Sequence, residues 1–151
     1  MAQQKEIIST INSLIETLKD GQEGFRQASE AVKDSNLKSL FDEFSQQRAR
    51  FATELQTEAT KLGEIEPETD SSTSGALHRA WINIKSVITS GDDHAILAEC
   101  ERGEDSAVNE YQEAMEENIT APVGDVIQRQ YRDVKNAHDR IKMLRDTTKD
   151  S

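Results

Sequence analysis

The chain has 151 residues, of which 31% are charged, and a formal net charge of −11. A chain of this length fits one domain with a real hydrophobic core, so we expect residues 1–151 to form a single domain. The sequence shows no basic face of the kind that nucleic-acid binding requires. The acidity also disfavours anionic membranes and favours cations over anions as ligands.

A single cysteine, Cys100, excludes an internal disulfide framework. We expect it to be a small buried hydrophobe, since the acidic neighbours Glu99 and Glu101 raise the pKa of a thiol and disfavour a reactive thiolate. The N-terminal residues lack the apolar segment of a signal peptide, and no apolar run approaches membrane-spanning length. The sequence therefore predicts a cytoplasmic protein with no membrane or nucleic-acid partner.

Apolar residues at helical spacing predict two long helices in the first half of the chain, at about residues 4–32 and 37–62. The break between them, Asp34-Ser35-Asn36, consists of residues that cap helices, and Gly63 suits the position just after a helix end. Because the connecting loop is short, we expect these helices to form an antiparallel hairpin.

The next segment, residues 64–91, is the least regular part of the chain. A polar loop at 64–74 precedes a short amphipathic helix at about 75–89, in which Trp81, Ile84 and Ile88 share a face with Leu77. That face either covers the bundle or forms the interface of a homodimer. A second copy of this chain is the partner that we expect.

Two further helices are predicted in the second half, at about 93–117 and from Pro122 to about Arg145. Asp92 and Asp93 suit the start of the first of these helices. Thr120 is the predicted N-cap of the second, with Pro122 in its first turn, and residues 146–151 form a tail that should fray.

Long helices with one apolar face pack as bundles. Residues 64–74 span roughly 36 Å if extended, and the short helix adds roughly 20 Å, so this segment can return along the whole bundle. One long crossover between two hairpins is the ferritin-like topology. We therefore predict an all-α, ferritin-like four-helix bundle with a short extra helix in the crossover; a five-helix up-down array is the alternative.

Several polar side chains interrupt the apolar stripes. Gln22, Arg48 and Gln130 are expected to form a buried polar network. Glu101 and Glu104 need a cation, several hydrogen-bond donors or a proton if they are buried. Three alternatives stay open for them: ion pairs with Arg48 and neighbouring arginines, a metal site, or exposure to solvent.

Mid-helix glycines at positions 21, 24 and 103 also need a reason, since each costs about 1 kcal/mol relative to alanine. Close approach of the first and third bundle helices is the preferred explanation, and a local π-bulge is the alternative.

Four segments spread over nearly the whole chain carry a resemblance to a known family. They are Leu18–Phe25 (LKDGQEGF), Gly75–Trp81 (GALHRAW), Glu99–Asp105 (ECERGED) and Ala137–Ile141 (AHDRI). In these segments the chain resembles a bacterial ferritin-like family of unknown function, usually labelled "four-helix-bundle protein". The resemblance implies a ferritin-like bundle in a stress-related or metal-related setting, with Glu104 at the position of the third helix's metal-binding glutamate.

Ferritin-like di-iron proteins also use Glu-x-x-His on two helices, a pattern that is absent from this sequence. Lys135 stands three residues before His138, and Arg48 occupies an inner position of the second helix. We therefore expect a non-enzymatic structural or interaction protein with a degenerate metal site. The alternative is an iron- or manganese-binding oxidoreductase whose ligands are Glu104, Glu101, Glu23 and His138. If no metal binds, we expect His138 to lie at the edge of the core with a hydrogen bond to a neighbour.

Overall fold

The computed structural model describes residues 4–63, 81, 83–90 and 92–148, and it is all-α over these residues. Its helices are α1 (Gln4–Ala31), α2 (Ser35–Lys61), α4 (Ile84–Ser90), α5 (Asp93–Glu116) and α6 (Val123–Thr147). The predicted polar loop at 64–74 and the first part of the predicted short helix lie outside the described residues. No described helix combines the length and apolarity needed to cross a bilayer.

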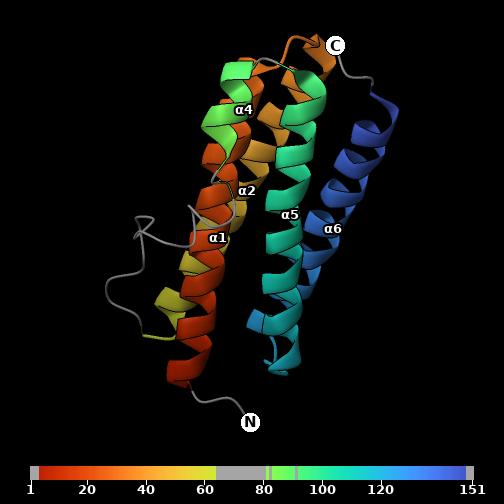
Figure 1. Ribbon diagram of the computed structural model, residues 1–151. Helices are drawn as coiled ribbons and strands as arrows, with labels where there is room; N and C mark the ends of the chain where they lie inside the picture. The colour runs from red at the N-terminus through yellow and green to blue at the C-terminus, as the bar shows by residue number, and fades with distance from the viewer. Residues whose placement is uncertain (1–3, 64–80, 82, 91, 149–151) are drawn as a thin grey trace.

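Two antiparallel hairpins, α1–α2 and α5–α6, form the bundle (Figure 1). The helices α2 and α5 run in the same direction, so α2 ends at one end of the bundle and α5 begins at the other. Helix α4 packs against α1 and α5 near the end that holds the α1–α2 turn. The predicted crossover topology is confirmed, and the five-helix array is wrong.

Local sequence explains where α2 begins and ends. The Asp34 side chain caps α2 by accepting hydrogen bonds from the amides of Asn36 and Leu37, as its position predicts. Just past the end of α2, Gly63 has a φ of +103°, a backbone conformation that favours glycine.

Helix α6 begins differently from the prediction. Pro122, and not Thr120, holds the N-cap position, and it makes no side-chain capping bond. The carbonyl of Thr120 instead accepts from the amide of Gly124. At its other end α6 continues to Thr147, past the predicted end at Arg145, with the Thr147 hydroxyl bonded to the carbonyl of Met143.

The core consists of two apolar clusters, one toward each end of the bundle. Leu14, Leu55 and Tyr111 belong to one cluster, and Phe25 and Trp81 belong to the other. On α1, α2 and α5 the two clusters occupy successive stretches of the helix, so each helix has a short segment between them where the core is not apolar. The polar centre of the molecule lies in this segment.

Trp81, which lies between α2 and α4 in the sequence, is a core residue. Its side chain is 4% exposed and meets the Phe25 ring edge-on, with 5.3 Å between centroids. Ile84 is buried as well, whereas Ile88 is only partly buried. Trp81 and Ile84 therefore cover the bundle, which is the first of the two roles predicted for this face, and the homodimer stays a prediction.

Candidate functional site

The buried centre of the bundle holds an ion pair between α2 and α5. Arg48 donates from Nη1 and Nη2 to the two carboxylate oxygens of Glu104, at 2.5 and 2.7 Å. The two side chains are each 1% exposed. Burial alone would lower the pKa of Arg48, but the Glu104 carboxylate outweighs it and the pKa is raised. The guanidinium also lies 5.3 Å from the centre of the Phe25 ring.

A second acidic residue, Asp20, lies beside this pair and was not predicted from the sequence. It is 2% exposed and lines a cavity of about 60 Å³ together with Arg48 and Glu104. A cavity of this size has room for a few water molecules. Asp20 and Gly21 of α1 are buried and both line this cavity, whereas the predicted Gln22 is only partly buried.

Gln130 is buried, as expected, but in a different group of contacts. It accepts from the Tyr111 hydroxyl at 2.7 Å and donates to Glu54 at 2.8 Å and to the carbonyl of Phe51 at 3.3 Å. Arg48, by contrast, bonds Glu104 and Gln47. The predicted network of Gln22, Arg48 and Gln130 therefore separates into distinct sets of hydrogen bonds.

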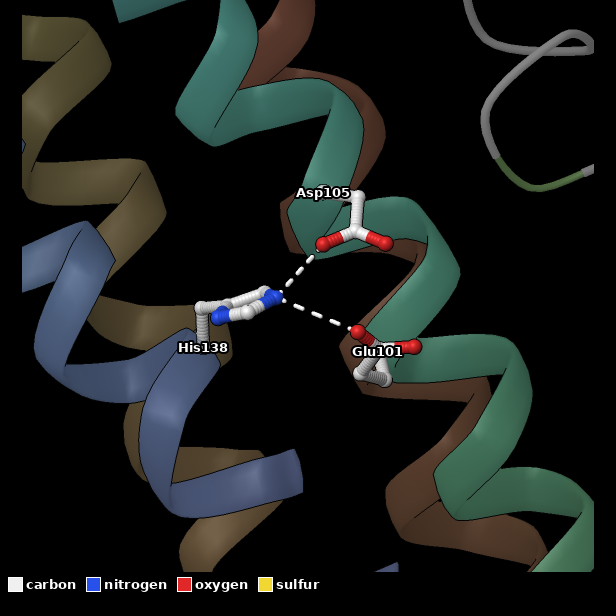
Figure 2. Close-up of side chains that lie close together, drawn as sticks. All are labelled: Glu101, Asp105 and His138. Carbon is white, nitrogen blue, oxygen red and sulfur yellow. Dashed lines mark hydrogen bonds and ion pairs between the residues drawn. The ribbon is translucent and has the colours of Figure 1, made fainter. Parts of the chain in front are cut away.

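A second polar cluster lies at the seam between α5 and α6 (Figure 2). His138 Nε2 is 2.5 Å from Asp105 Oδ1 and 3.2 Å from Glu101 Oε2. On the other side of the ring, Nδ1 is 3.0 Å from Asp139 Oδ1. Arg145 Nη1 donates to the remaining oxygen of Glu101 at 2.9 Å. We call Glu101, Asp105 and His138 the seam cluster.

The carboxylates set the charge of the histidine. Burial lowers the pKa of His138, but the hydrogen bonds with Asp139 and Asp105 and the charges of Asp105 and Glu101 outweigh it, so the pKa is raised. The His138 and Glu101 side chains are 12% and 14% exposed, whereas Asp105 is 54% exposed. One side of the seam cluster is therefore open to solvent.

The four residues expected as metal ligands do not meet at one point. Glu104 is bonded to Arg48, and Glu23 is bonded to Arg26 and Gln27. Only Glu101 and His138 come together, and Asp105 joins them. In the part of the chain that the structure describes, this is the one group of three His, Cys, Asp or Glu side chains whose ligand atoms converge.

The position of Asp105 beside Glu101 could have been predicted from its spacing, although Asp105 does not lie on the apolar face of the helix. Residues four apart on a helix are neighbours on its surface, so Glu101 and Asp105 share one face of α5. Glu104 lies on the inner face instead. The Glu101–Glu104 pair that stands out in the sequence is thus divided between two sites.

Cys100 is fully buried beside the centre. Burial raises the pKa of its thiol well above the usual range, and the charges of Glu104 and Glu99 add to that effect. The residue is therefore packed as a hydrophobe and is not activated as a nucleophile.

Comparison with known proteins bears on the fold and on the family. The chain is similar to the crystal structure of a two-domain protein from Anabaena variabilis that contains DJ-1/ThiJ/PfpI-like and ferritin-like domains. The TM-score is 0.73 and the identity 18%, over 97% of this chain and 37% of that one. The present chain thus spans well under half of that protein, and the likeness shows a ferritin-like fold. No curated protein matches the chain. A family model described as "Domain of unknown function (DUF2383)" matches residues 6–117, which is most of the sequence, and the protein belongs to this family.

Proposed function

We propose that this protein is a non-enzymatic ferritin-like bundle, a structural or interaction module whose centre is filled by an ion pair. The buried, bidentate contact between Arg48 and Glu104 carries the proposal. In di-iron bundle proteins, carboxylates and histidines from all four helices project into this central region and hold the metal. Here a guanidinium supplies the positive charge that Glu104 needs.

The chemistry of the pair opposes a metal at Glu104. Both of its carboxylate oxygens already accept hydrogen bonds from Arg48. A metal cation bound there would displace a buried guanidinium, leaving that charge without a partner or bringing it close to the ion. Removing one member of a buried ion pair typically costs about 3–5 kcal/mol.

The structural neighbour supports the module part of the proposal. In that protein a ferritin-like domain occurs together with a DJ-1/ThiJ/PfpI-like domain. A bundle of this fold therefore works there beside a second domain. We propose by analogy that the present bundle acts through contacts with a protein partner.

Two methionine substitutions test the structural role of the pair. Arg48→Met and Glu104→Met should each destabilise the fold by about 3–5 kcal/mol, because each leaves one charge buried without the partner that forms its bidentate contact. The double variant should recover most of that loss, because it buries neither charge. Arg129→Met is the matched control: its pair with Glu54 is partly exposed, so the cost should be about 1 kcal/mol or less.

Iron oxidation provides the opposing test. Chelator-treated protein supplied aerobically with Fe²⁺ should oxidise it no faster than the buffer does. If the wild type oxidises Fe²⁺ and a folded Glu104→Gln variant does not, the centre is catalytic and the proposal is wrong. Equal instability of the double and single methionine variants would contradict the ion-pair argument.

A further inference from the structure

We propose that Glu101, Asp105 and His138, the seam cluster, bind one divalent transition-metal ion of the Zn²⁺ class between α5 and α6. One ligand atom from each side chain lies within 4.8 Å of the other two. Figure 2 shows the two carboxylates of α5 directed toward the imidazole of α6. This site is separate from the Arg48–Glu104 pair, and the inference does not depend on the function proposed above.

The donor atoms are close to the spacing that a small cation requires. In a tetrahedral Zn²⁺ site with bonds of about 2.0–2.2 Å, neighbouring ligand atoms are about 3.3 Å apart. His138 Nε2 lies 3.2 Å from Glu101 and 2.5 Å from Asp105. At 2.5 Å, Asp105 must move outward to share an ion with the imidazole, and its 54% exposed side chain can rotate into solvent.

Hydrogen bonds alone satisfy this arrangement poorly. Two carboxylate oxygens approach the same nitrogen, and Nε2 has at most one hydrogen to donate. A metal ion accepts a lone pair from all three atoms at once. The ion would therefore resolve a competition that the proton cannot.

Neighbouring residues hold the ligands from behind. Asp139 lies 3.0 Å from His138 Nδ1, the carboxylate contact that commonly orients a metal-binding histidine. Arg145 binds Oε1 of Glu101, which leaves Oε2 directed at the imidazole. Arg145 also places a positive charge against the cluster, and this charge limits the affinity for an ion without occupying the Glu101 oxygen that faces the imidazole.

The donor set indicates the class of ion. An imidazole nitrogen suits Zn²⁺, Fe²⁺ or Co²⁺, whereas Ca²⁺ and Mg²⁺ prefer sites built from oxygen alone. Three protein ligands leave at least one position for water. The open side at Asp105 gives an ion a route from solvent.

Calorimetric titration of the chelator-treated full chain with Zn²⁺ tests the site, with Co²⁺ absorption as a second probe of coordination. We expect one ion per chain in the wild type. His138→Gln and Asp105→Asn should each weaken binding at least tenfold and remove the Co²⁺ absorption band. Asp105 is exposed, so its variant tests binding without disturbing the core. His94→Gln, on the same helix as Glu101 but outside the cluster, should bind within twofold of the wild type.

Three results would overturn the inference. The first is no Zn²⁺ binding by the wild type. The second is binding that is unchanged in His138→Gln, in Asp105→Asn and in a folded Glu104→Gln variant, which would indicate diffuse attraction to an acidic surface. The third is binding that survives these changes but is lost in a folded Glu104→Gln variant, which would place the ion at the bundle centre. That last result also contradicts the proposed function, whereas the first two leave it intact.

Discussion

Substituting the mid-helix glycines with alanine should change the free energy of unfolding in opposite directions at different positions. A Cβ atom at Gly103 would lie 2.4 Å from the Trp81 ring, and one at Gly24 would lie 2.5 Å from it. At Gly21 the nearest atom is Nη1 of Arg48, at an ordinary contact distance of 3.4 Å. The indole thus occupies the space that alanine would need at two of the three sites.

The expected magnitudes follow from two opposing effects. Alanine in place of glycine inside a helix stabilises by about 1 kcal/mol. Overpacking a buried site costs about 1–3 kcal/mol, and the indole cannot turn away because it is 4% exposed between α1 and α5. Gly103→Ala should therefore destabilise the protein by up to about 2 kcal/mol, whereas Gly21→Ala should stabilise it by up to about 1 kcal/mol.

Urea unfolding followed by circular dichroism measures both effects. The same Gly103→Ala change should become stabilising in a Trp81→Ala background, because the obstructing ring is gone. This reversal of sign is the sharpest part of the prediction. If Gly103→Ala stabilises the wild-type protein as much as Gly21→Ala does, the ring does not lie against Gly103 and the reasoning fails.

Three further outcomes are expected. Replacing Asp34 with alanine should cost about 1 kcal/mol in thermal or urea unfolding, because two amides at the start of α2 lose their acceptor; an unchanged midpoint would show that the cap is dispensable. Burial raises the pKa of Tyr111 far above its ordinary value of 10.0. The contribution of Tyr111 to the free energy of unfolding is therefore fully present when the pH is below this ordinary value. It is lost as the pH rises further, because only the unfolded chain can then release the phenolic proton. Tyrosinate absorbance from Tyr111 should therefore appear only as the protein unfolds in alkali. If Tyr111→Phe reduces the absorbance change that precedes unfolding, Tyr111 ionises in the folded protein and the prediction is wrong. Cys100 should react with a thiol reagent only as fast as the protein opens, and rapid labelling under native conditions would contradict its burial.

Helical periodicity was sufficient to predict the bundle and its crossover. The stripes place residues on a face of each helix, and the lengths of the connections decide which helices pair. Asp34 and Gly63 gave clear signals because capping and a positive φ depend on local chemistry. The prediction of Thr120 as an N-cap was wrong. A threonine followed by a proline two residues later is typical of a helix start, but in the structure Pro122 itself holds the N-cap position.

Partners across the bundle could not be predicted in the same way. A stripe shows that Arg48 and Glu104 face inward, but not which side chains meet there. The contact with Arg48 was therefore one of three alternatives for Glu104. Two of the glycines illustrate the same limit: close approach of helices was expected, whereas the Trp81 ring fills the space at Gly24 and Gly103. The seam cluster was missed in part, since Asp105 lies off the apolar face.

The position of Trp81 has a consequence for how the chain folds. Each hairpin forms from contacts between helices that are consecutive in the sequence, and such contacts form faster than those between more distant segments. The indole instead joins Gly24 of α1 with Gly103 of α5, which are far apart along the chain. Docking of the two hairpins and closure of the crossover around this ring should thus be one late, non-local event. Trp81 fluorescence should report that event separately from helix formation in a stopped-flow experiment.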